Sequence, residues 1–293
     1  MNITAEDISK FRAQTGAGMM DCKKALEEAN GDVELAAEIL RKKGVLKAAK
    51  REDKVAAEGL VLVKVKDNFG VVLEVNSETD FVAKNEDFQK MVDEIADFLL
   101  EKRPNSLESA MSEKIGDITL TDYLNNFIGK IGEKISFRRF EILEKSENQV
   151  FGPYLHMGGK IAVLSLLSGT ADETLARDIS MQAAAANPKF LNREMVDTET
   201  LDKEREIYAE QLRAQGKPEN IIENILKGKM DKFYSEVCLL EQPFIKDEEK
   251  TITAYLAEKG ADIKVEKYVR FELGEGIKKV EKNFADEVAE QMA

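Results

Sequence analysis

Two segments far apart in the chain share one pattern of aromatic and charged residues: Phe137-Arg138-Arg139-Phe140-Glu141-Ile142 and Tyr268-Val269-Arg270-Phe271-Glu272-Leu273. Each closes a stretch in which apolar runs typical of strands come before an amphipathic helix. In the first stretch, 60–65 and 71–75 predict strands, and 88–99 and 124–131 predict helices. In the second, 160–167 predicts a strand and 175–186 predicts a helix that ends before Asn187-Pro188. We therefore predict an α+β fold with two related core subdomains, residues 55–145 and 146–275.

Residues 4–44 precede the first subdomain and predict three short helices. Thr4 and Asp7 approximate a capping box, and residues 15–18 break the first helix. The 3- and 4-residue spacing of apolar side chains at 19, 22, 26 and 29 predicts the second helix. The third is expected to begin after Asp32 and to end at Gly44. We interpret residues 1–54 as a three-helix module like the ubiquitin-associated (UBA-like) type, followed by a basic linker that is solvated rather than a binding patch.

The second subdomain carries an insertion at about 193–240. Apolar residues recur at helical spacing on both sides of a turn at 215–218, which predicts an antiparallel helical hairpin. The hairpin either packs on its own domain or forms a homodimer contact, because a protruding apolar surface needs a cover. After Gly274-Glu275-Gly276, apolar periodicity predicts a last amphipathic helix over 276–293.

The charge balance and the side-chain inventory exclude several functions. The chain has 43 basic and 56 acidic residues, a net charge of −13, which makes direct nucleic-acid binding a poor hypothesis. The single histidine, His156, rules out a zinc site with two or more histidines, and no phosphate loop is present. We predict no catalytic residue, no metal site and no cofactor, and hence no enzyme.

Cellular location is predicted from the cysteines and the apolar runs. Cys22 and Cys238 both fall in predicted helices, and we interpret them as reduced, buried thiols rather than a disulfide. No apolar run approaches the roughly 20 residues that span a bilayer, and the N-terminus has no secretory or transit signal. We expect a cytoplasmic protein without a membrane partner.

Two motifs indicate what the chain binds. Thr79-Asp80-Phe81-Val82 stands between a strand and a helix, where a loop is expected, and it places an aromatic ring beside a carboxylate. Such a ring is either tucked into its own core or presented to a partner. The second motif is Phe11-Arg12-Ala13-Gln14-Thr15-Gly16-Ala17-Gly18-Met19-Met20-Asp21-Cys22-Lys23-Lys24-Ala25-Leu26. With both motifs at this separation, the chain from residue 3 onward resembles the elongation factor Ts family of bacteria and organelles, which exchanges nucleotide on elongation factor Tu.

The resemblance implies roles for individual residues. In the family, the phenylalanine of the first motif inserts between two helices of the partner's GTP-binding domain. The aspartate acts with it to disturb the Mg²⁺ site and the phosphate loop, so these roles fall on Phe81 and Asp80, while Thr79 and Val82 shape the loop. Further partner contacts are implied at Arg12, Met19, Met20, Ile131, Gly132 and His156. The competing interpretations are helix-core packing for the methionines and an ordinary surface or hydrogen-bonded histidine.

The resemblance also implies that the hairpin serves dimerisation and that the C-terminal module reaches the partner's nucleotide-binding domain. The predicted function is nucleotide exchange: the chain binds the GDP-bound GTPase, promotes GDP release and stabilises the nucleotide-free state until GTP binds. Such a factor needs a rigid wedge and no catalytic side chain. Two alternatives remain. One is an adaptor that binds through residues 4–44, which leaves the Thr-Asp-Phe-Val segment without a role. The other is an enzyme, which predicts a pocket with perturbed pKa values.

Overall fold

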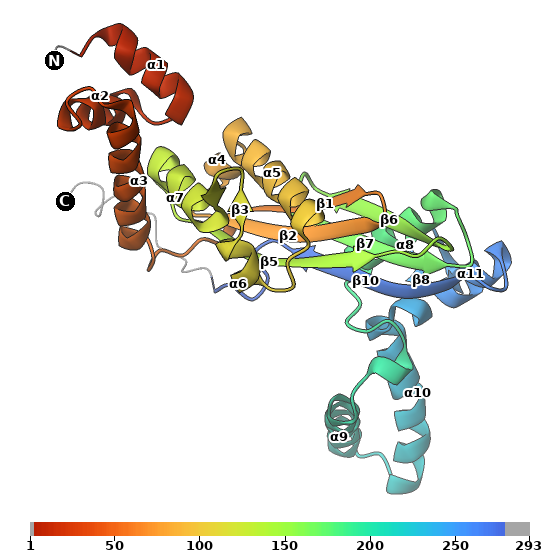
Figure 1. The fold of residues 1–293 in the computed structure, drawn as a ribbon. Helices are drawn as coiled ribbons and strands as arrows, with labels where there is room; N and C mark the ends of the chain where they lie inside the picture. The colour runs from red at the N-terminus through yellow and green to blue at the C-terminus, as the bar shows by residue number, and fades with distance from the viewer. Residues whose placement is uncertain (1–2, 279–293) are drawn as a thin grey trace. The chain divides into compact units, whose positions relative to one another are not determined.

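The computed structural model describes residues 3–278 and shows the predicted α+β class of fold, with small antiparallel sheets (Figure 1). Within these residues the α-helices are α1 (Ala5–Thr15), α2 (Met19–Glu28), α3 (Val33–Lys50), α4 (Asp80–Ala83), α5 (Glu86–Lys102), α6 (Leu107–Ser112), α7 (Leu120–Ile131), α8 (Glu173–Ala186), α9 (Thr198–Ala214), α10 (Glu219–Val237) and α11 (Ile252–Lys259). The short 3₁₀ helices are η1 (Arg193–Met195) and η2 (Leu239–Glu241).

The strands are β1 (Glu58–Lys66), β2 (Phe69–Ser77), β3 (Lys114–Ile115), β4 (Ile118–Thr119), β5 (Ile135–Glu144), β6 (Gln149–His156), β7 (Ile161–Ser168), β8 (Pro243–Phe244), β9 (Asp247–Thr251) and β10 (Lys264–Glu272). They form three-stranded sheets in the orders β1-β2-β5 and β10-β7-β6, and two-stranded sheets β3-β4 and β8-β9. The described part of the chain divides into two compact units: residues 3–62, 73–140 and 272–278 form the first, and 63–72 and 141–271 form the second. Most of the predicted helix at 276–293 lies outside the described residues.

Helices α1, α2 and α3 pack around a small core in the first unit. The predicted capping box is present, because Asp7 N–H donates to Thr4 Oγ1 at 3.2 Å and Thr4 N–H donates to Asp7 Oδ2 at 3.0 Å. The core consists of Phe11, Cys22, Ala25, Leu26, Ala29 and Ala36. Only two of these side chains are large, and each contributes about 1.5–3 kcal/mol when fully buried. A core this small gains from further packing, which α3 makes on α7. The UBA-like classification stays a prediction.

The prediction that Gly44 ends the third helix is wrong, because α3 continues to Lys50. Gly44 lies where α3 crosses α7: a Cβ added there would stand 3.0 Å from the Asn125 carbonyl oxygen. A Cβ on Gly129 of α7 would stand 3.1 Å from the Gly44 Cα. Lys47 adds a bond across the same crossing, since its Nζ donates to the Gly129 carbonyl at 3.0 Å. Gly44 therefore permits close helix packing instead of stopping a helix.

The rest of the first unit is built around β2 and α5. The part of β2 that belongs to this unit, residues 73–77, is fully buried and includes the end of the apolar run seen in the sequence. Asn85 caps α5, with its Oδ1 accepting from Asp87 N–H at 2.8 Å. The apolar face of α5 is fully enclosed through Phe88, Met91, Val92, Ile95 and Leu99. The predicted helix at 124–131 is present as α7.

In the second unit, α8 covers β6 and β7, and this layer holds the unit's core. Strand β6 was not predicted, because Gly152-Pro153 interrupts its pattern. The sheet tolerates Pro153 because β6 is an edge strand, where a residue without a backbone N–H can be accommodated. A Cβ on Gly152 would stand 2.2 Å from the Ala176 carbonyl oxygen, so glycine is needed for α8 to approach the sheet.

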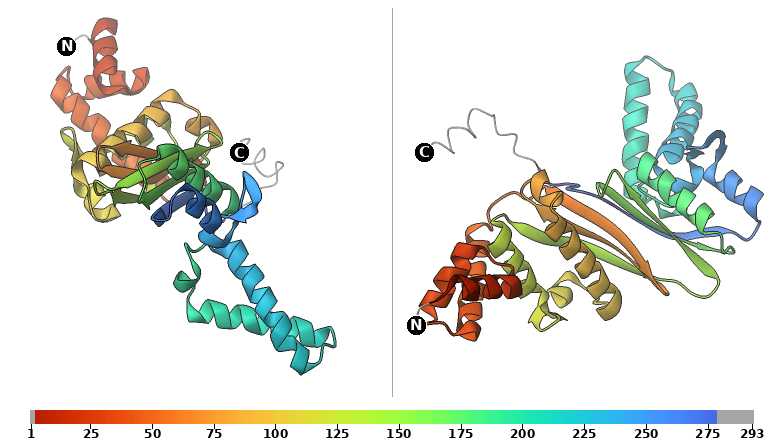
Figure 2. Two further views of the ribbon diagram at one scale, coloured as in Figure 1. Left: turned by 90° about the vertical axis from the view of Figure 1, so that its right-hand side faces the viewer. Right: turned by 90° about the horizontal axis from the view of Figure 1, so that it is seen from above.

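The predicted helical hairpin is present as α9 and α10, which fold back on each other from a turn at 215–218 (Figure 2). Ala209, Leu212, Ile222 and Leu226 form an apolar cluster between the two helices. At the base of α10, Arg193 pairs with Asp231 at 3.0 Å and with Glu241 at 2.5 Å. Its guanidinium also lies 4.3 Å from the ring centroid of Tyr234. The hairpin is thus attached to its own unit by packing and by paired charges.

Candidate partner-binding site

The Thr-Asp-Phe-Val segment is a single helical turn, not the loop that the sequence predicted. Thr79 is the N-cap of α4, and its Oγ1 accepts from Val82 N–H at 3.4 Å. Ala83 is buried and holds the turn against the first unit, whereas 80% of the Phe81 side chain is exposed. The alternative that Phe81 packs into its own core is therefore wrong. An aromatic ring so exposed is available for contact with another molecule.

Charged groups flank the exposed ring. Lys84 Nζ pairs with Asp80 Oδ2 at 2.6 Å, one helical turn away, and lies 6.0 Å from the Phe81 ring centroid. The Asp80 side chain is 45% exposed and that of Lys84 is 73% exposed. An ion pair at such exposure is worth about 0–1 kcal/mol. The Asp80–Lys84 pair is therefore a weak contact on its own.

The base of the α4 turn is bound to the segment that follows α7. The Glu133 carboxylate accepts from Thr79 N–H at 3.0 Å and from Thr79 Oγ1–H at 2.7 Å. Ser77 Oγ–H donates to the Thr79 carbonyl at 2.9 Å. The backbone N–H, the backbone carbonyl and the hydroxyl of Thr79 are therefore all hydrogen-bonded, which fixes the position and direction of the residue before Asp80.

A second set of bonds holds Glu78. Arg51, directly after α3, brings its Nη1 within 3.0 and 2.9 Å of the two carboxylate oxygens of Glu78. Lys134 N–H donates to Glu78 Oε1 at 2.6 Å, and Lys134 Nζ donates to the carbonyls of Glu52 and Lys54. Three chain segments, 51–54, 78–79 and 133–134, therefore meet at the start of α4.

The structure brings some of the predicted site residues together in the first unit. Ile131 is the last residue of α7, and Gly132 ends that helix with φ +84°. Both directly precede Glu133 and so adjoin the α4 turn. Met19 and Met20 on α2 are 57% and 61% exposed, which makes the core-packing alternative wrong for both. Arg12 on α1 is also exposed.

His156 belongs to the second unit. It is the last residue of β6 and is half-buried. Its Nδ1 lies 2.9 Å from the Tyr154 hydroxyl, and the two rings stack with centroids 5.8 Å apart. This is the hydrogen-bonded histidine of the competing interpretation, and a role in partner binding stays a prediction.

Sequence reasoning missed Glu74, a supporting residue in β2. Its carboxylate is fully buried and accepts from Arg138 at 2.9 Å, from Arg139 at 2.6 Å and from Gly274 N–H at 2.8 Å. Burial alone would raise the pKa of Glu74. Hydrogen bonds from Gly274, Arg138 and Asn76, with the charge of Arg139, outweigh burial and hold this pKa below its ordinary value. A glutamate inside the run Val71–Asn76 was the signal for a buried charge that needs partners.

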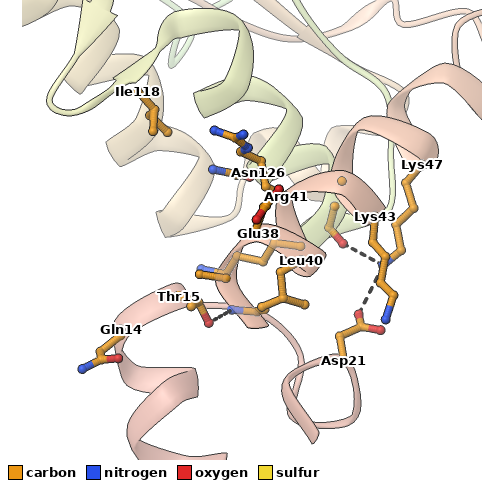
Figure 3. A pocket seen from close by; sticks show the side chains of 15 residues that line it. Gln14, Thr15, Asp21, Glu38, Leu40, Arg41, Lys43, Lys47, Ile118 and Asn126 are labelled. Atoms are coloured by element: carbon orange, nitrogen blue, oxygen red, sulfur yellow. Dashed lines mark hydrogen bonds and ion pairs between the residues drawn. The ribbon is translucent and has the colours of Figure 1, made fainter. Parts of the chain in front are cut away.

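A cavity of about 600 Å³ lies between α3, α7 and the turn that joins α1 to α2 (Figure 3). Its lining mixes charges of both signs, including Asp21, Glu38, Arg41 and Lys47. The pKa of Glu38 is lowered, chiefly by a hydrogen bond from Lys42. A general acid would need this pKa raised instead.

Neither a metal cluster nor a membrane span was found among the described residues. Residues 3–278 contain no group of three or more His, Cys, Asp or Glu side chains arranged to hold a metal ion. None of the helices in this part of the chain has the length and apolar composition to cross a membrane.

An exposed aromatic ring on a turn braced from three chain segments is the geometry of a protein that acts by docking on another protein. The family model described as Elongation factor TS matches residues 78–275, which run from the residue before Thr79 to the Gly274-Glu275 turn. This chain belongs to the elongation factor Ts family. That family promotes nucleotide exchange on elongation factor Tu, and it makes or breaks no bonds in a substrate. Helices α1, α2 and α3 lie outside the matched residues.

Proposed function

We propose that this chain is the guanine nucleotide exchange factor for elongation factor Tu, with Phe81 as its wedge. It binds the GDP-bound GTPase, promotes GDP release and stabilises the nucleotide-free state until GTP binds. The observation that carries the proposal is the 80% exposure of Phe81 on a turn whose base is fixed by hydrogen bonds. Family membership supports the reaction, and the exposed ring supports the mechanism.

The wedge acts through differential binding. Phe81 enters between two helices of the GTP-binding domain, where its ring is buried only if those helices separate. Asp80, released from Lys84, disturbs the Mg²⁺ site and the phosphate loop. A buried aromatic hot spot contributes roughly 2–4 kcal/mol. A coupling of about 3 kcal/mol between factor and nucleotide weakens each by roughly two orders of magnitude. The binding free energy of one buried ring is therefore comparable to the coupling that exchange requires.

Other contacts extend the same interface. Ile131 and Gly132 touch the GTP-binding domain beside the wedge, because they adjoin Glu133 at the base of α4. Further contacts fall on Arg12, Met19 and Met20 on exposed positions of the N-terminal helices, and on His156 in the second unit. We also keep the homodimer as a proposal for the hairpin, where Ile207 and Ile221 are 47% and 44% exposed.

The test is stopped-flow release of fluorescent GDP from elongation factor Tu, with the wild-type chain, Phe81→Ala and Met195→Ala. Met195 is a matched control, an apolar side chain that is 56% exposed and outside the proposed contacts. We expect acceleration by wild type and by Met195→Ala, and a rate lower by about one to two orders of magnitude for Phe81→Ala.

The other outcomes separate the parts of the proposal. Acceleration that is unchanged in Phe81→Ala keeps nucleotide exchange and moves the mechanism to Asp80 or the flanking contacts. No acceleration by a folded wild-type chain rejects exchange and favours the adaptor that binds through α1, α2 and α3.

A further inference from the structure

The turn that carries Phe81 is too short to hold its own shape. Helix α4 has four residues, and forming the first turn of a helix fixes several backbone angles in return for a single hydrogen bond. The Thr79 cap bond within the turn is long, at 3.4 Å. The direction in which Phe81 projects therefore depends on contacts from outside α4.

We propose that Glu133 is a positioning residue for nucleotide exchange, which acts by holding Thr79 and so directing Phe81 toward the partner. The inference rests on the proposed wedge. One carboxylate accepts both the backbone N–H and the hydroxyl of Thr79, at 3.0 and 2.7 Å. Two bonds to one residue fix its orientation as well as its position, and bonds to an ionised acceptor are the stronger kind.

Local backbone geometry explains why Glu133 points at Thr79. Gly132 ends α7 with φ +84°, and its N–H donates to the Ile128 carbonyl at 2.8 Å. The chain thus leaves the helix in a sharp, defined turn. The next residue after Glu133 returns the contact, since Lys134 N–H donates to Glu78 at 2.6 Å. We call Glu78, Thr79, Glu133 and Lys134 the α4 junction.

The α4 junction is also bound to the segment that follows α3. Arg51 pairs with Glu78 at 2.9 Å, and Lys134 Nζ reaches the backbone carbonyls of Glu52 and Lys54. Every charged member of the junction therefore faces an opposite charge or a backbone group. Loss of Glu133 alone leaves the Arg51–Glu78 pair and the Lys134 bonds in place. We expect the fold to survive while α4 loses its direction.

Thr79 and Glu133 are only half-buried, so water can replace their bonds in a variant. What disappears is the preference for one orientation of α4. If the competent orientation falls to about one tenth of the population, effective exchange falls about tenfold. The loss acts through Phe81, because Glu133 itself need not touch the partner.

The experiment is a double-mutant cycle on catalysed GDP release. It uses the full chain as wild type, Glu133→Ala, Phe81→Ala and the double variant, each at subsaturating factor concentration. We expect Glu133→Ala to lower the rate about tenfold in the wild-type background and less than about twofold in the Phe81→Ala background. A residue that acts only through Phe81 has nothing left to direct once that ring is gone.

Two further variants keep the test decisive if Glu133→Ala folds poorly. Thr79→Ser keeps both donors to Glu133 and should retain the rate within about twofold, whereas Thr79→Ala loses one bond and the cap and should fall toward Glu133→Ala. Glu108→Ala is the control, an exposed glutamate on α6 outside the site. Melting curves accompany every rate.

The outcomes divide clearly. A normal rate in Glu133→Ala, while Phe81→Ala is impaired, overturns the positioning role and leaves the wedge intact. Multiplicative losses in the double variant overturn it as well, because Glu133 then acts independently of Phe81. If Phe81→Ala itself is unimpaired, the wedge fails, and the positioning role fails with it.

Discussion

Replacing Glu74 with glutamine tests whether its buried carboxylate stabilises the first unit. The side chain has no exposed surface, and it receives hydrogen bonds from two arginines, a backbone N–H and the Asn76 amide. Glutamine has nearly the same shape and keeps one acceptor oxygen. It presents an NH₂ group where the carboxylate accepted from arginine, so Glu74→Gln removes the charge without opening a cavity.

The expected cost follows from what the substitution leaves behind. Removing one partner of a fully buried ion pair costs about 3–5 kcal/mol, because the other charge stays buried. Here the side chains of Arg138 and Arg139 are 28% and 30% exposed, so water can hydrate part of the freed charge. A hydrogen bond to a charged group is worth about 1.5–3 kcal/mol. We therefore expect a loss of about 2–3 kcal/mol in the free energy of unfolding.

Urea unfolding followed by circular dichroism measures this loss, and its pH dependence tests the cause. The pKa of Glu74 is lowered in the folded chain, so its stabilisation is complete above the ordinary glutamate pKa of about 4.3 and disappears as pH falls through the folded pKa. The difference between wild type and Glu74→Gln should be constant from pH 8 to about pH 5 and should shrink below about pH 4.

The control is Glu141→Gln in the second unit, whose carboxylate pairs with Lys267 at 2.7 Å while both side chains stay about half exposed. Such a surface pair should contribute less than about 1 kcal/mol. A cost for Glu74→Gln below about 0.5 kcal/mol, or an equal cost at pH 3 and pH 7.5, would refute the reasoning.

Two further predictions concern packing and thiol reactivity. Gly44→Leu should destabilise the α3–α7 crossing by about 1–3 kcal/mol, seen as faster proteolysis after Lys50 or Arg51, because a Cβ there already meets the Asn125 carbonyl at 3.0 Å. Gly228→Leu on α10, where a Cβ meets nothing within 4 Å, should be harmless, and equal effects would contradict this account. Burial raises the pKa of Cys238 to about 11, so the native chain should react slowly with a thiol reagent at pH 8 and rapidly in denaturant. Rapid reaction of Cys238 in the native state would be the opposite result.

Local patterns in the sequence predicted local structure well. The spacing of Phe88, Met91, Val92 and Ile95 predicted α5, and these residues form its buried face. Asn187 was expected to end a helix, and it is the C-cap of α8 with φ +45°. Periodicity and caps depend on neighbours within a few residues, so one sequence carries the information.

The failures share a different cause, which is contact between distant segments. Gly44 looked like a helix stop, but its lack of a side chain allows α3 to pack closely against Asn125 of α7, 81 residues along the chain. Met19 fitted the apolar spacing of α2 but is 57% exposed. Strand β6 was not predicted because Gly152 looks like a strand breaker, whereas its lack of a side chain allows α8 to pack closely on the strand. In each case the deciding neighbour is absent from the local sequence.

The candidate site shows the same difference between local patterns and contacts from distant segments. The motif at 79–82 led us to predict a partner contact there, but no local rule predicts that Phe81 is exposed. Glu133 gave no signal, because an ordinary acidic residue after a helix acquires meaning only when the fold brings it to Thr79, 54 residues away. A contiguous motif can be recognised in one sequence, whereas a residue that supports it from a distant segment cannot.

A braced wedge also has a thermodynamic rationale. An exchange factor must use its binding energy to open the partner, and any energy used to order its own surface is lost to that task. Fixing a mobile side chain at an interface costs about 0.5–1.5 kcal/mol, and ordering a backbone turn adds to it. On the mechanism proposed above, the α4 junction sets the direction of the Phe81 turn before the partner arrives. The roughly 2–4 kcal/mol that a buried aromatic ring contributes then remains available for separating the partner's helices. On this argument, the half-buried bonds of Glu133 matter more for exchange than for stability.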